Sequence, residues 1–197
     1  LNRENLLAFN LVPQVMCAGR QSWTMVNKDS VIAGTRAIPL YIGRANYEKA
    51  MQVLKRGPLF EVMAVPSRKV GLLITGTEVF EGIIKDRFRP IITNKAEKLG
   101  SRVIKTIISP DDRETIKQSV LELIQCGAEI IVTTAGLSVD PDDVTRKGIM
   151  DAGAEDMLYG IPVLPGAMTM LTRIDQVPVI GVPACALYFK TTSFDLI

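Results

Sequence analysis

The stretch "IIVTTAGLSVDPDDVT", Ile130 to Thr145, joins a short apolar run to a cluster of acids. The apolar run ends abruptly in the small residues TTAG, and Asp140, Asp142 and Asp143 follow a few positions later. A short apolar run bounded by turn residues is typical of a strand that is buried on both faces, as in a parallel sheet. We therefore expect this stretch to begin as a buried strand and to continue as a turn that places carboxylates at the edge of a sheet.

Strand and helix signals alternate on both sides of this stretch. Short apolar runs predict strands, and apolar residues at helical spacing that stop at glycine predict helices. The predicted strands are 69–75, 101–109, 128–134 and 177–183, and the predicted helices are 89–100, 113–127, 142–154, 167–174 and 186–197. This alternation predicts an α/β fold with a mostly parallel sheet and helices on both faces.

Residues 1–68 have a different pattern. Apolar and polar residues are mixed over 21–42, which we interpret as two short β segments. Residues 44–57 predict a helix that ends at Gly57, and 59–68 predict a strand or a linker. The sequence thus predicts a small mixed α+β accessory segment, partly β, at 1–68, followed by an α/β domain at 69–197.

Composition excludes several classes of function. The net charge is only +2 and no basic cluster is interleaved with aromatic residues, so we expect no nucleic-acid partner. No apolar run reaches the roughly 18 residues of a membrane helix, so we expect no membrane span. The absence of histidine excludes Ser-His-Asp catalysis and His-ligated zinc. Three widely spaced cysteines argue against a disulfide framework and favour a reducing, cytoplasmic compartment. The chain begins at Leu1 rather than methionine, so we expect its natural N-terminus to lie upstream.

Ligands of open α/β sheets bind at the carboxyl ends of the strands, so the loops there are the candidate sites. The first is the turn Thr75-Gly76-Thr77 with Glu78, whose small residues leave backbone N–H groups able to face a ligand. Taken alone, this loop is more simply explained as a plain turn with solvated acids. The second loop carries Asp111, for which helix capping is the alternative role.

The third loop holds the three acids of the opening stretch. Bare carboxylates repel a phosphate, so Asp140, Asp142 and Asp143 suit magnesium better than they suit an anion. The alternative is a helix N-terminus whose dipole favours acids. The fourth loop begins with Pro183 and Ala184, a backbone turn after the last predicted strand. The residues that follow, Lys190, Thr191, Thr192 and Ser193, offer a charge and hydroxyls that could hold phosphate, and a surface helix face is the alternative.

Taken in order, these segments resemble the molybdopterin-binding domain family. That family includes molybdopterin adenylyltransferases, molybdopterin molybdotransferases and the competence-inducible proteins that share the domain. "TTAGLSVDPDDVT" is similar to the family's glycine-rich loop and acidic helix start, "TGTEV…GIIKD" to its first loop, "SPDD" to its second acidic loop and "GVPA" to its Pro-Gly turn. The resemblance covers about 69–197 and implies a three-layer α/β/α domain that forms a homo-oligomer, a dimer or a trimer.

The resemblance also implies the ligands and the roles of individual residues. The ligand is molybdopterin, a pterin phosphate, with Mg²⁺ and ATP as further cofactors in the adenylyltransferases. Thr133, Thr134, Gly136 and Ser138 match positions that line the pterin pocket. Asp111 and Asp143 match the acids that adenylyltransferases use with magnesium and ATP, and Asp86 matches an acid of the first loop that we assign to metal with Asp140 and Asp142.

Two positions depart from the family pattern. Ala135 and Ala184 stand where the family has glycine, and a methyl group at either position narrows the approach of a ligand to the backbone. Three hypotheses follow: an enzyme of molybdenum cofactor maturation, by adenylyl transfer or metal insertion; a non-catalytic carrier or sensor of the cofactor; and a purely structural or assembly protein.

Overall fold

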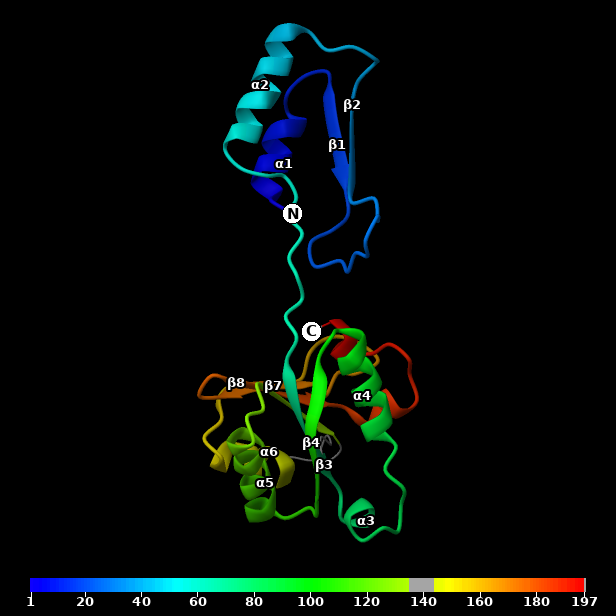
Figure 1. Ribbon diagram of the computed structural model, residues 1–197, viewed down its shortest axis with the longest axis vertical. Helices are drawn as coiled ribbons and strands as arrows, with labels where there is room; N and C mark the ends of the chain where they lie inside the picture. The colour runs from blue at the N-terminus through cyan, green and yellow to red at the C-terminus, as the bar shows by residue number, and fades with distance from the viewer. Residues whose placement is uncertain (135–143, 197) are drawn as a thin grey trace. The chain divides into compact units, whose positions relative to one another are not determined.

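A computed structural model describes residues 1–134 and 144–196 of the chain (Figure 1). The contacts within it divide the chain into two compact units, Leu1–Ala64 and Val65–Ile197. Among the described residues no helix is long and apolar enough to cross a membrane.

The first unit packs two helices against a two-stranded antiparallel sheet. Its elements are α1 (Arg3–Asn10), β1 (Val15–Gly19), β2 (Ala33–Ala37) and α2 (Arg44–Lys55). Its small core consists of Phe9, Val12, Cys17, Ala50, Val53 and Leu59. The helix predicted at 44–57 is confirmed as α2, whereas only one of the two β segments predicted within 21–42 is present, as β2, because its partner β1 precedes that range.

An asparagine side chain lies along the free edge of β1. The Asn10 amide donates to Cys17 O at 2.8 Å, and Cys17 N donates to Asn10 Oδ1 at 2.7 Å. Both backbone groups of Cys17 are therefore satisfied on the side away from β2.

The second unit contains one six-stranded sheet in the order β4-β3-β5-β8-β7-β6. The strands are β3 (Lys69–Thr75), β4 (Arg102–Ser109), β5 (Ile130–Thr134), β6 (Glu155–Tyr159), β7 (Met170–Ile174) and β8 (Val177–Val182). The helices are α3 (Thr77–Phe80), α4 (Phe88–Lys98), α5 (Arg113–Gln125), α6 (Val144–Asp151) and the 3₁₀ turns η1 (Ala184–Leu187) and η2 (Ser193–Leu196). Strands β4, β3, β5 and β8 are parallel, while β7 and β6 add an antiparallel margin. The predicted mostly parallel α/β fold is confirmed.

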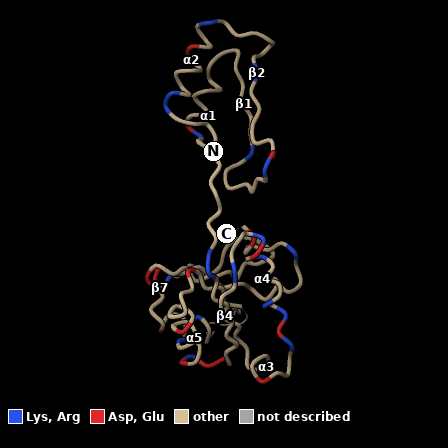
Figure 2. The backbone as a smooth tube through the Cα atoms, in the orientation of Figure 1, with Lys and Arg blue, Asp and Glu red and all other residues tan. Residues whose placement is uncertain are grey.

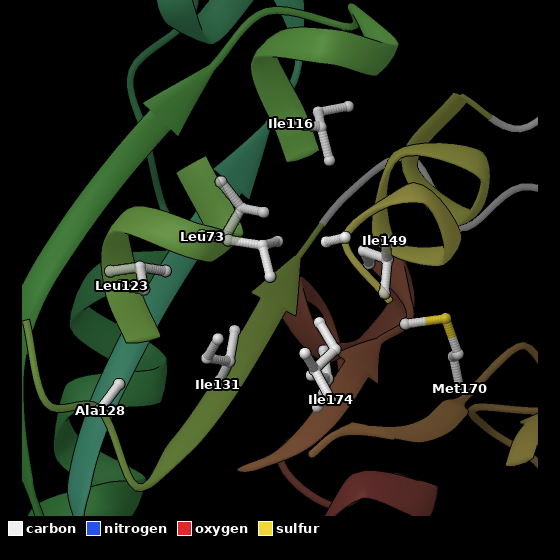
Figure 3. Close-up of a cluster of buried hydrophobic side chains, with 11 residues drawn as sticks. Leu73, Ile116, Leu123, Ala128, Ile131, Ile149, Met170 and Ile174 are labelled. Atoms are coloured by element: carbon white, nitrogen blue, oxygen red, sulfur yellow. The ribbon is translucent and has the colours of Figure 1, made fainter. Parts of the chain in front are cut away.

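Two apolar clusters cover the two faces of this sheet, because successive strand residues point to opposite sides. Leu73 of β3 and Ile131 of β5 face α5 and α6 (Figure 3). Their neighbours Leu72 and Val132 face α4 and η1. Both faces of the central strands are therefore buried, which is why their sequences are nearly continuously apolar.

Two predicted helices were wrong. Residues 167–174 contain the strand β7, in which Met170, Thr172 and Ile174 are buried at every second position, a period that favours a strand. The described residues of the predicted helix 186–197, which are 186–196, form no closing α-helix. The described part contains the end of η1 and the 3₁₀ turn η2, because Ser193 is held by Pro165 and Gly166 instead of by a helical ladder. The stretch 59–68, predicted as strand or linker, has no regular secondary structure.

Candidate functional site

The carboxyl ends of the four parallel strands lie side by side. Thr75 pairs with Ser109 at the ends of β3 and β4, and Ile74 pairs with Thr134 at the end of β5. Thr134 in turn pairs with Val182 at the end of β8. The loops that follow these strands therefore begin at one edge of the sheet, the edge at which open α/β sheets bind ligands.

The first two predicted loops are in direct contact. Asp111 Oδ2 accepts from Thr77 N at 3.0 Å and from Thr77 Oγ1 at 3.4 Å, and Asp111 N donates to Thr77 Oγ1 at 3.2 Å. Gly76 N donates to Ser109 O at 3.0 Å, and Gly76 has φ +141°, a conformation that favours glycine. The structure thus brings Gly76, Thr77 and Asp111 together, and it uses the Asp111 carboxylate to hold the start of α3. Acidic residues gather on α3 and at the start of α5 (Figure 2).

The neighbouring acid, Asp112, is the helix cap. Its Oδ1 accepts from Thr115 N at 2.8 Å and from Thr115 Oγ1 at 2.6 Å at the N-terminus of α5. The hydrogen bond from the Thr115 hydroxyl is the main cause that lowers the pKa of the Asp112 carboxyl, and the bond from the Thr115 backbone N–H is the second. Both donors favour the charged form of the carboxyl. Helix capping therefore accounts for Asp112. Asp111 remains as the acid that faces the first loop at the carboxyl edge of the sheet.

Asp112→Ala should make the stability of the protein depend less on pH in the acidic range. Because the folded-state pKa of Asp112 is lowered, its stabilisation is complete above the unfolded pKa of about 4 and is lost as the pH falls through the folded value. We expect the variant to have a lower thermal midpoint than the wild type at pH 7 and a much smaller deficit at pH 3. Asp112→Asn, which keeps an acceptor oxygen, is the control. If Asp112→Ala lowered the thermal midpoint equally at both pH values, the assignment would be contradicted.

Three predicted threonines are fully buried at the ends of β3 and β5. Thr75, Thr133 and Thr134 each have 0% exposed surface. The Thr75 hydroxyl is engaged, since it contacts Thr134 O at 3.2 Å and Thr145 Oγ1 at 3.1 Å. In contrast, the Oγ1 atoms of Thr133 and Thr134 have no hydrogen-bond partner in the part of the chain that the structure describes.

These two hydroxyls are informative because buried polar groups are nearly always satisfied. A buried hydroxyl without a partner costs about 1–3 kcal/mol. A pterin phosphate or another polar ligand at this edge would offer the partner that the described residues do not supply. The chemistry of Thr133 and Thr134 therefore fits the ligand that the resemblance implies.

The remaining predicted residues are not joined to this group by a described contact. Asp86 Oδ1 accepts from Phe88 N at 2.7 Å and from Arg89 N at 3.2 Å, so this carboxylate stabilises the start of α4. Glu78 is exposed on α3, Pro183 is buried, and Ala184 is exposed at the start of η1. Gly136, Ser138, Asp140, Asp142 and Asp143 lie outside the described residues. Within 1–134 and 144–196, no three acidic or cysteine side chains are grouped so as to hold a metal ion.

The structure adds one group that sequence reasoning missed: Thr145, in the first turn of α6, is 1% exposed and meets Thr75. Ser193, a hydroxyl that the sequence offers for phosphate, is instead bonded within the protein. Its Oγ donates to Gly166 O at 2.6 Å, and its N donates to Pro165 O at 2.9 Å. No spacing rule links residues so distant in sequence; the only available signal was the number of Ser and Thr residues near predicted strand ends.

Comparison with known proteins assigns the second unit to a protein family. A family model described as a probable molybdopterin binding domain matches residues 71–197. A CinA-like protein of Mycobacterium leprae (strain TN) is 31% identical over 106 residues, which are 49% of this chain and 25% of that protein. A molybdopterin adenylyltransferase of Pyrococcus furiosus is 28% identical over 92 residues, 47% of this chain and 54% of that protein. The chain thus spans about a quarter to a half of the length of these relatives.

A solved structure shows the same fold. The molybdopterin biosynthesis Mog protein from Mycobacterium ulcerans superposes with a TM-score of 0.51 and 17% identity, covering 61% of this chain and 88% of that one. At this identity the likeness concerns the fold alone.

Proposed function

The chain belongs to the molybdopterin-binding domain family. From this membership we propose that it binds molybdopterin at the carboxyl edge of its sheet and transfers AMP from Mg²⁺-ATP to the molybdopterin phosphate, with release of pyrophosphate. The observation that supports the location is the pair of unsatisfied hydroxyls, Thr133 Oγ1 and Thr134 Oγ1, at the end of the central strand β5. Their side chains point to opposite faces of the sheet, so each would donate separately to an oxyanion or a ring nitrogen of the pterin phosphate.

The catalytic part of the proposal assigns few roles to protein groups. Phosphoryl and nucleotidyl transfer depend mainly on positioning and on neutralising charge. Magnesium would neutralise the triphosphate, held by Asp140 and Asp142 with Asp86 as a further acid. Asp111 and Asp143 would act on the metal-bound nucleotide. The backbone N–H groups of Gly76 and Thr77, which the turn offers to a ligand, already donate to Ser109 O and Asp111 Oδ2. We propose a reducing, cytoplasmic location, which fits the free thiols of Cys17, Cys126 and Cys185. We also propose a homo-oligomer, from the resemblance to the family.

A second function, a non-catalytic carrier of the cofactor, is favoured by one contact. The Asp111 carboxylate already accepts two hydrogen bonds from Thr77, which leaves it less available for a metal ion. Incubation of the pure protein with molybdopterin and Mg²⁺-ATP decides between the two. Formation of adenylylated molybdopterin, lost in Asp143→Ala, supports transfer; binding without ATP consumption supports the carrier.

Thr133→Val tests the site with opposite effects on binding and on stability. Removal of a buried hydroxyl that lacks a partner should raise the free energy of unfolding by about 1 kcal/mol. The same change should weaken binding of the fluorescent, oxidised form of molybdopterin by about tenfold, which corresponds to ~1.4 kcal/mol. Urea denaturation and fluorescence titration measure the two quantities.

Thr133→Ser is the matched control, because it keeps the hydroxyl and should bind the probe as the wild type does. A destabilised Thr133→Val protein with unchanged affinity would show that the hydroxyl has an internal partner and would remove this support for the site.

A further inference from the structure

One buried hydroxyl joins three elements at the candidate site. Thr75, the last residue of β3, donates through Oγ1 to Thr134 O at the end of β5, at 3.2 Å. The same oxygen lies 3.1 Å from Thr145 Oγ1 in the first turn of α6. All three residues are at most 1% exposed, so water does not compete for these contacts.

The chemistry of a hydroxyl makes this arrangement directional. A threonine hydroxyl carries one proton and two acceptor lone pairs. Because Thr75 donates its proton to Thr134 O, its oxygen remains as an acceptor toward Thr145. The end of β5 and the start of α6 are therefore both fixed to a single side chain of β3.

This use of the hydroxyl changes the role that the sequence suggests for Thr75. A side chain that is fully buried and bonded on both sides inside the protein is not presented to a ligand. We propose that Thr75 and Thr145 are positioning residues, which hold the first turn of α6 against the ends of β3 and β5 so that the binding groups of this edge keep their geometry. The inference rests on the proposed function only in its effect on binding, since the two hydroxyl contacts of Thr75, called the tie below, involve only residues of this chain.

The other buried threonines provide a contrast. Thr133 and Thr134 have hydroxyls without a described partner, whereas Thr172 Oγ1 donates to Glu155 O at 2.6 Å. Thr172 lies on β7 and its partner on β6, both outside the parallel strands whose ends form the candidate site. Thr172→Val thus removes a comparable buried donor without touching the tie and is a matched control.

Hydrogen exchange of the full chain without ligand tests the tie itself. We expect Thr75→Val to speed amide exchange in α6 by about tenfold relative to α4, because the variant loses both hydroxyl contacts. Thr75→Ser, which keeps the hydroxyl, should retain wild-type exchange in α6, and Thr172→Val should leave the ratio of α6 to α4 exchange unchanged. Equal α6 exchange in Thr75→Val and Thr75→Ser would overturn the proposal.

Titration with the fluorescent, oxidised form of molybdopterin tests the positioning role. We expect Thr75→Val to weaken binding by about tenfold, with recovery in Thr75→Ser and no loss in Thr172→Val. Equal affinities in Thr75→Val and the wild type would overturn the positioning role. If the wild type itself does not bind this probe, the proposed function fails, and the exchange measurement still decides whether Thr75 ties α6 to the sheet.

Discussion

Gly166→Ala is expected to destabilise the second unit by about 4 kcal/mol, the largest effect that we predict. Two causes contribute. Gly166 has φ +118°, which L-residues rarely adopt. A methyl group there would lie 2.1 Å from Ser193 Oγ and 2.9 Å from Ser193 N, so it would displace the side chain that fastens η2. Far-UV circular dichroism during urea denaturation measures the loss.

Gly160→Ala separates the two causes. Gly160 also has a positive φ, +86°, but its added methyl group would meet no atom closer than Ala167 O at 3.8 Å. We therefore expect only the backbone strain there, about 1 kcal/mol. The double variant Gly166→Ala with Ser193→Gly should recover part of the loss, and strictly additive effects of the two changes would refute the proposed contact.

Gly148→Ala is expected to lower the free energy of unfolding by about 2 kcal/mol. The direction is opposite to helix propensity, since alanine is favoured over glycine in a helix by about 1 kcal/mol. The methyl group would lie 2.7 Å from Ile116 Cγ2 and 2.8 Å from Arg113 O, and the second of these is backbone that cannot rotate away. Thermal and urea unfolding both report the change.

Met150→Ala on the same helix is the control. Met150 is exposed, so this substitution should alter stability by less than about 0.5 kcal/mol. A Gly148→Ala protein as stable as the wild type, or more so, would mean that α5 and α6 lie further apart than these distances require. Their approach is also marked by the ion pair of Arg113 with Asp151, in which Nη2 donates to Oδ1 at 2.6 Å.

The parallel core of the fold was predictable because its strands are buried on both faces. A continuous apolar run such as 69–75 strongly favours a doubly buried strand when helices with glycine stops lie between it and similar runs. The antiparallel margin was not predictable in the same way. The segment before Ile174 mixes Thr and Arg with apolar residues, and only its pairing with β8 shows that the burial has a period of two.

The candidate site was predictable as a set of loops but not as a set of contacts. Strand ends located Thr75, Asp111 and Thr133 at one edge, since parallel connections require it. The sequence did not show that Asp111 would be bonded to Thr77, or that Thr75 would be enclosed while the Thr133 hydroxyl found no partner among the described residues. Such distinctions depend on side-chain rotamers and on partners about 34 or more positions away, which no local pattern encodes.

The side-chain amide of Asn10 has a consequence for how the first unit behaves in concentrated solution. An exposed strand edge is a template on which a second chain can add its own strand. At Cys17 the amide already occupies the N–H and the C=O that an incoming strand would use. The side chain thus acts as a one-residue mimic of a neighbouring strand, and it disfavours edge-to-edge aggregation through β1 without lengthening the sheet.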